Sequence, residues 1–213
     1  MRTITVKGVG TASTRPDYAV INITLESDGF EYGKALETAA KAVDLMTSAL
    51  VSVGFEKSDL KTSDYSVRTE YKSVRDKNGD YSKKFDGYVC RYQLKLGLDF
   101  DTERLGKALG ALTSVDPKPE ISVDFTVKDP SAVSEKLLRS AAENARAKAL
   151  ILCEALGVKL GGLVTIDYDW SDINIISECR ADSVAMCSER VIADIEPEEI
   201  SSSDSARFVW EIV

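Results

Sequence analysis

The sequence predicts an α+β protein in which two long helices and one short helix pack on antiparallel β-sheets. Two long stretches carry apolar side chains at helical spacing, and each ends at a glycine, Gly54 or Gly157. Around them apolar and polar residues alternate, as in strands with one buried face. Asn78-Gly79 separates two such stretches, which favours the tight turn of a long β-hairpin.

The chain begins with strands. Residues 4–6 predict a short strand that Gly8 and Gly10 end, and Arg15-Pro16-Asp17 predicts a turn. Residues 18–27 predict a strand, and its apolar face consists of Ala19, Ile21, Ile23 and Leu25.

The first long helix is predicted over residues 31–53. Its apolar stripe consists of Leu36, Ala39, Ala40, Val43, Met46, Leu50 and Val53.

A long hairpin follows. Residues 60 to about 74 are extended, and the aromatic and β-branched residues Tyr65, Val67, Thr69 and Tyr71 share one face. Residues 88–100 alternate regularly and form the return strand. Thirteen residues span about 43 Å, which is long for a strand, so a bend or bulge is expected near Gly97.

The next part of the chain predicts a short helix, a strand and a second long helix. Asp101 caps a short helix with Leu105, Leu109 and Leu112 facing inward, and residues 121–127 form the next strand. Asp129 and Pro130 then start the second long helix. Its apolar face consists of Val133, Leu137, Ala141, Ala145, Ala149, Leu152 and Leu156.

The C-terminal part is less regular. Residues 163–170 predict a half-buried strand with Val164, Ile166, Tyr168 and Trp170 on one face. Brief strands are expected near residues 173–176 and 191–195. Residues 197–205 predict a polar connector, and residues 207–212 a closing strand.

The domain organisation is predicted as one domain over 1-213, with sub-units 1-100 and 101-213 as a finer division. A shift of 103 residues places Ala39, Gly54 and Leu60 on Ala142, Gly157 and Leu163. This echo has two interpretations, an internal α/β duplication or chance similarity between two helix-to-strand units.

Composition excludes several functions. A net charge of -8 disfavours nucleic acid as a partner, because no basic face is available to release counterions. The chain has no histidine, which removes the usual general base and metal ligand.

No run of apolar residues is long enough for a transmembrane helix, and residues 1–6 look like a strand rather than a signal peptide. The location predicted from the sequence as it stands is therefore cytoplasmic; the alternative is the periplasm or cell envelope, with a signal peptide removed.

The four cysteines give no metal or redox motif. Cys90 and Cys153 are predicted to be buried thiols. Cys179 and Cys187 lie eight residues apart, and free thiols are favoured over a disulfide.

The remaining motifs are weak. Ser58 and Lys61 match Ser-x-x-Lys, but Lys61-Thr62-Ser63 overlaps them, whereas serine acylases bring such motifs from distant segments. Asp167 and Asp169 share a strand face, which favours solvent exposure over cation binding. The tyrosines of the hairpin favour a packed or interfacial surface: Tyr65, Tyr71, Tyr88 and Tyr92. We predict no catalytic residue, no cofactor and no metal.

The chain resembles the SIMPL domain family (DUF541). The resemblance is carried by Ile4-Thr5-Val6-x-Gly8-x-Gly10, Arg15-Pro16-Asp17, Leu60-Lys61-Thr62, Tyr65, Tyr71, Phe125, Asp129, Ala141, Ala145, Lys148-Ala149, Leu156-Gly157, Leu160-Gly161 and Ile195-x-Pro197. It implies helices on antiparallel strands, homo-oligomers and export, with no established enzymatic activity. The chain departs from the family at Pro197-Glu198, where Pro-Gly is usual.

Taken together, these observations predict a non-enzymatic protein that assembles with itself or binds a cell-envelope protein partner through strand edges and the hairpin. The resemblance to the SIMPL family also implies a link to stress defence. The alternative is a small-molecule or peptide binding module with a cleft between helices and sheet.

Overall fold

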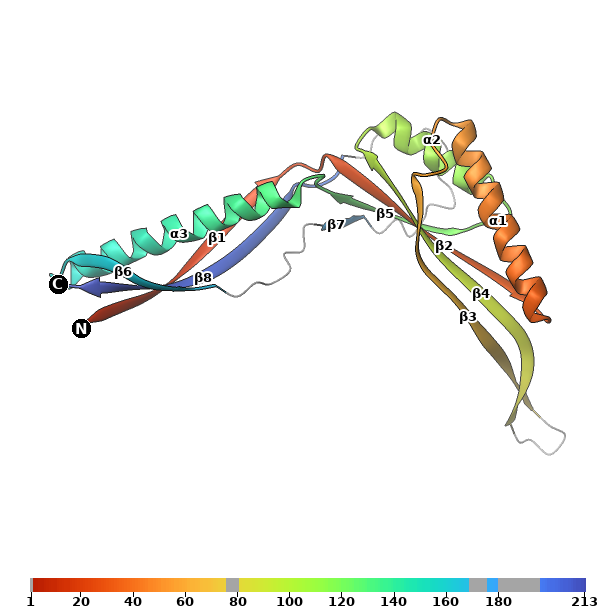
Figure 1. Cartoon of the computed structure of the whole chain (residues 1–213), viewed down its shortest axis with the longest axis horizontal. Coiled ribbons are helices and arrows are strands. Elements are labelled where there is room, and N and C mark those ends of the chain that lie inside the picture. Colours follow the sequence, from red (N-terminus) through yellow and green to blue (C-terminus); the bar gives the residue numbers. More distant parts are fainter. Residues whose placement is uncertain (1, 76–80, 169–175, 180–195) are drawn as a thin grey trace. The chain divides into compact units, whose positions relative to one another are not determined.

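The computed structural model describes residues 2–75, 81–168, 176–179 and 196–213 and divides into two compact units (Figure 1). The first unit comprises Met1–Asp17, Thr126–Ser177 and Pro197–Val213, and the second comprises Tyr18–Phe125 and Glu178–Glu196. The described residues form three helices and two sheets whose registered strand pairs are antiparallel, which confirms the α+β class. The domain division and the internal duplication stay predictions.

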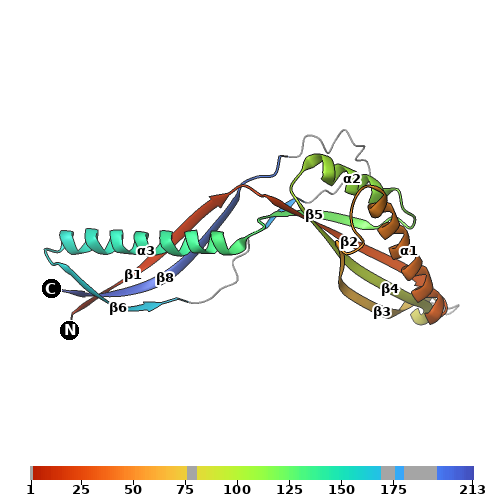
Figure 2. The same ribbon diagram turned by 45° about the horizontal axis from the view of Figure 1, so that its top comes forward.

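The first unit is a three-stranded sheet with one helix on its face. The sheet has the order β1 (Thr3–Thr14), β8 (Ile200–Ile212), β6 (Leu160–Asp167), and each neighbouring pair is antiparallel. Helix α3 (Pro130–Ala155) lies along β1 and β8 in both Figure 1 and Figure 2. The predicted N-cap is confirmed, because the Asp129 carboxylate accepts a hydrogen bond from the Ser131 amide at 3.0 Å.

The buried face of α3 follows the predicted alanine stripe and differs at its end. Its buried residues are Val133, Leu137, Ala141, Ala145, Ala149 and Cys153. Leu152 and Leu156 were expected there but are 45% and 73% exposed. The four-residue step continues from Ala149 to Cys153, so the helix ends with both leucines on its outer side.

Gly8 and Gly10 do not end the first strand, as the sequence predicted; β1 continues through them to Thr14. A Cβ added at Gly8 would lie 2.1 Å from the Ala141 carbonyl oxygen, and one at Gly10 would lie 2.0 Å from the Leu137 carbonyl oxygen. These glycines therefore permit close packing of strand on helix, which is the second role a strand glycine can have.

Two helices pack on the larger sheet, and most of these elements belong to the second unit. Strands β2 (Tyr18–Gly29), β3 (Leu60–Arg75), β4 (Tyr81–Asp99), β5 (Glu120–Thr126) and β7 (Ile176–Cys179) have the order β3-β4-β2-β5-β7. The helices are α1 (Tyr32–Ser52) and α2 (Thr102–Thr113). The predicted apolar face of β2 is confirmed, and its four residues Ala19, Ile21, Ile23 and Leu25 lie in the main core.

Both helices of this unit begin and end near the predicted residues. The Asp101 carboxylate accepts a hydrogen bond from the Arg104 amide at 2.7 Å, which confirms the cap of α2. Gly54 follows α1 with a φ of 99°, a conformation that favours glycine. The buried stripe of α1 differs from the prediction, because Ala35 and Ala42 are buried and Ala40 is exposed.

The hairpin is confirmed by the antiparallel pairing of β3 with β4, although the predicted turn at residues 76–80 lies outside the described residues. A bend or a bulge was expected near Gly97, and the β2–β4 register excludes the bulge, because it runs without a shift through Val20 opposite Gly97. Register shifts occur instead between Thr62 and Asp64 and between Glu70 and Tyr71. Gly97 has a different role, because a Cβ there would lie 2.3 Å from the Tyr18 hydroxyl oxygen.

The C-terminal strand is longer than predicted. β8 begins at Ile200, so residues 200–205, predicted as a connector, belong to the sheet, and Ser202 and Asp204 are buried. The register pairs these residues with Ala12 and Gly10 of β1, whose continuation the sequence did not indicate. Trp170, Cys187 and the strand predicted at residues 191–195 lie outside the described part of the chain, whereas Ile176–Cys179 forms a short strand near the predicted one.

Candidate interaction surface on the hairpin

Strands β3 and β4 place aromatic residues on the face that α1 partly covers. Near the middle of the strands, Cys90 packs against Ala35 and Ala39 of α1 and is buried. The register then sets Tyr65 opposite Tyr92 and Tyr71 opposite Phe85. Because side chains two residues apart share a face, the aromatic residues continue along the hairpin on the side of the helix.

A bulge brings Phe85 onto this face. Tyr88 lies opposite Thr69, and simple alternation along β4 would next place Asp86 on the same side. The register shift between Glu70 and Tyr71 puts Phe85 opposite Tyr71 instead. Bulges commonly re-aim a side chain in this way, and the regular alternation in the sequence gave no sign of it before Tyr88.

Phe85 is the centre of a partly exposed cluster, which we call the aromatic surface: Phe30, Tyr32, Tyr71, Phe85 and Tyr88. The Phe85 ring lies 5.6 Å from Phe30, 6.0 Å from Tyr71 and 5.3 Å from Tyr88, each with an edge-to-face geometry. Such pairs stabilise one another beyond their burial. Phe30 is nevertheless 73% exposed and Tyr71 is 55% exposed.

The opposite face of the hairpin is polar. Glu26 lies 3.5 Å from the Arg68 guanidinium and 3.7 Å from that of Arg91, and Lys72 pairs with Asp86. The hairpin therefore has one aromatic face and one charged face. Contiguous exposed apolar residues beside a polar rim are typical of sites for protein association.

The edge beside the aromatic surface is also available for pairing. β3 stands at the end of the strand order, so the described residues supply no neighbour on its outer side. It is sixteen residues long. A long edge presents backbone donors and acceptors that can pair with another strand.

Two tyrosines of the hairpin that lie outside the aromatic surface, Tyr65 and Tyr92, have raised pKa values. Loss of solvation, together with the neighbouring Cys90 thiol, raises the pKa of Tyr65 to about 12. Loss of solvation also raises the pKa of Tyr92. Both hydroxyls therefore stay protonated and uncharged, which suits a contact surface better than a reaction centre.

The other motifs noted in the sequence do not converge. The Ser58 hydroxyl donates to the Glu56 carboxylate at 3.2 Å, and no hydrogen bond joins it to Lys61 among the described residues. Asp167 lines a pocket of the first unit, whereas Asp169 lies outside the described part of the chain. Within the described ranges, no group of three His, Cys, Asp or Glu side chains has a metal-binding arrangement.

Two pockets bear on the alternative of a ligand cleft between helices and sheet. One, of about 390 Å³, lies in the first unit, and the other, of about 370 Å³, lies beside Asp101 and Arg104 in the second. Most of the residues that line each pocket are charged or polar, whereas ligand pockets are mostly apolar. The alternative stays a prediction. Apolar side chains fill the space between α1 and its sheet.

No helix in the described part of the chain has both the length and the apolar character needed to cross a membrane. Residues 4–210 match a family described as SIMPL, protein of unknown function (DUF541). The chain is also similar to the 26 kDa periplasmic immunogenic protein of Brucella melitensis biotype 1, and to the protein of the same name in Brucella abortus. Each is 27% identical over 163 residues, which is 76% of this chain and 65% of the relative's length.

Proposed function

The chain belongs to the SIMPL family of unknown function, and on this premise we propose that it is a non-enzymatic protein that assembles with a second copy of itself. The observation that carries the proposal is the aromatic surface beside the open edge of β3. Relatives named as periplasmic support a periplasmic location instead of the cytoplasmic one predicted from the sequence.

The sequence of β3 is complementary to itself. When two copies pair antiparallel about Thr69, Arg68 of each faces Glu70 of the other on the charged side. On the aromatic side, Val67 of each copy faces Tyr71 of the other. Opposite charges and apolar pairs directly across two strands stabilise a sheet. This complementarity favours a second copy over an unrelated partner strand.

A mixing experiment tests this pairing. Arg68→Glu leaves only carboxylates at positions 68 and 70, and Glu70→Arg leaves only guanidinium groups, so each variant alone repels its own copy. We expect light scattering to show wild-type protein as an oligomer, each variant alone with a lower mass, and their equimolar mixture as an oligomer again. Two variants that assemble alone like the wild type, or a mixture that stays dissociated, would contradict the proposal.

A link to stress defence, which the family resemblance suggested, is a second part of the proposal. Growth of a deletion strain under peroxide, with and without the wild-type gene, tests it. Unchanged growth of the deletion strain would remove this part and leave self-assembly unaffected.

A further inference from the structure

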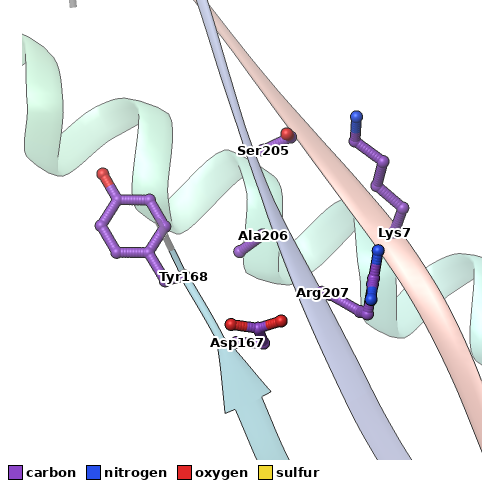
Figure 3. A pocket seen from close by; sticks show the side chains of 6 residues that line it. All are labelled: Lys7, Asp167, Tyr168, Ser205, Ala206 and Arg207. Atoms are coloured by element: carbon purple, nitrogen blue, oxygen red, sulfur yellow. The ribbon is translucent and has the colours of Figure 1, made fainter. Parts of the chain in front are cut away.

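We propose that the sheet of the first unit binds a phosphate group between Lys7 and Arg207, on the face opposite α3. Lys7 and Arg207 contribute to the lining of a pocket of about 390 Å³, together with Asp167, Tyr168, Ser205 and Ala206 (Figure 3). Lys7 belongs to β1, and residues 205–207 belong to β8. Asp167 is the last residue of β6, and Tyr168 follows it. All of them lie in the first unit.

The two cations are held side by side by the fold. Lys7 of β1 lies opposite Arg207 of β8 in the antiparallel register. Their neighbours Val6 and Phe208 are buried in the cluster that includes Ala145 and Ala149 of α3. A slip by one residue would expose those apolar side chains, so burial on the inner face fixes the cation pair on the outer face.

Neither cation has a partner among the described residues. No carboxylate oxygen lies within 4.0 Å of the charged nitrogens of Lys7 or Arg207, although Asp167 is the register partner of Arg207. Tyr168 is engaged elsewhere, since its hydroxyl donates to the Asp204 carboxylate at 2.7 Å. Like charges directly across two strands destabilise a sheet, and an anion bound between them removes that cost.

The chemistry of the lining favours a phosphate group. The planar guanidinium of Arg207 presents a fork of donors that matches phosphate oxygens, and the Lys7 ammonium adds a point charge. Ser205, on the same strand as Arg207, adds a hydroxyl to the lining. Asp167 repels an anion and therefore sets a limit to the affinity.

Calorimetric titration of the full chain with inorganic phosphate at low ionic strength tests the site, because screening by salt weakens exposed charges. We expect saturable binding that Lys7→Gln and Arg207→Gln each weaken by about fivefold or more, and that Asp167→Asn tightens by a similar factor. Lys57→Gln removes an exposed lysine of the second unit and should leave binding unchanged.

Circular dichroism establishes that each variant is folded before titration. No saturable heat from the wild type, or wild-type affinity for phosphate in Lys7→Gln or Arg207→Gln, would overturn the proposal. Weaker binding by Asp167→Asn would also overturn it, since it would make the carboxylate a ligand rather than a source of repulsion.

Discussion

Gly8 and Gly10 let β1 approach the backbone of α3, because a Cβ at either position would overlap a carbonyl oxygen of the helix. A strand glycine either weakens the strand or permits a close approach, and the pattern of residues 4–10 does not distinguish the two. Which role applies depends on residues 137–145, more than a hundred positions later in the chain. The small alanine side chains there let the strand lie close to the helix backbone. Local signals that need no distant partner were predictable, such as the Asp129 and Asp101 caps and Gly54 and Gly157.

Replacement of Gly8 by alanine should destabilise the protein by about 2–3 kcal/mol, because the added methyl group overlaps the Ala141 carbonyl and α3 must move away. Gly110→Ala is the matched control, since nothing lies within 4 Å of a Cβ at that position inside α2. It should stabilise the protein by about 0.5–1 kcal/mol. Urea unfolding measures both; a neutral Gly8→Ala would show that the close packing is not required.

Helix α3 closes one edge of its sheet through side chains that bond to the backbone of β1. Ser140, Asn144 and Lys148 recur every four residues along the helix. Asn144 accepts from the Val9 amide at 3.1 Å, Ser140 accepts from the Thr11 amide at 3.3 Å, and Lys148 donates to the Lys7 carbonyl at 3.3 Å. Covering an edge in this way prevents unwanted pairing of strands. β3, in contrast, has no helix side chains bonded along its outer edge among the described residues.

Asn144→Ala should therefore loosen the closed edge. The Val9 amide loses its acceptor, at a cost of about 1 kcal/mol, so its hydrogen exchange should speed up by about fivefold. Glu143→Ala changes an exposed neighbour on the same helix and should leave that rate unchanged. Equal exchange of the Val9 amide in both variants would show that Asn144 does not protect the edge.

The helices and most of the strands could be predicted from the sequence, whereas the side-chain contacts between them could not. Hydrophobic periodicity located all three helices and the β3–β4 hairpin, because burial on one face repeats within each element. The tyrosines of the hairpin were expected to form a packed or interfacial surface, but Phe30, Tyr32 and Phe85 were missed. Phe85 joins that surface only because of a bulge in β4. Phe30 and Tyr32 join it from the connection between β2 and α1 and from the first residue of α1. None of these positions follows from a repeating pattern in the sequence.

In the molecule as a whole, the charge of the chain and the surface of the hairpin have opposite effects on association. The net charge of -8 opposes non-specific association, so any stable assembly needs a specific complementary site. The β3 edge offers that site through Arg68, Glu70 and the adjoining aromatic surface. The sequence indicated strand edges in general and could not identify β3, since strand order depends on contacts distant along the chain.

Hydrogen exchange of the β3 amides at low and high protein concentration tests whether two copies pair through this edge. Assembly should slow exchange within residues 64–75 at high concentration, because the outer edge becomes paired. Phe30→Ser should reduce this slowing, whereas Leu156→Ser, which replaces a residue of the first unit with the same 73% exposure, should not. Exchange of β3 that is independent of concentration in the wild type would contradict the account.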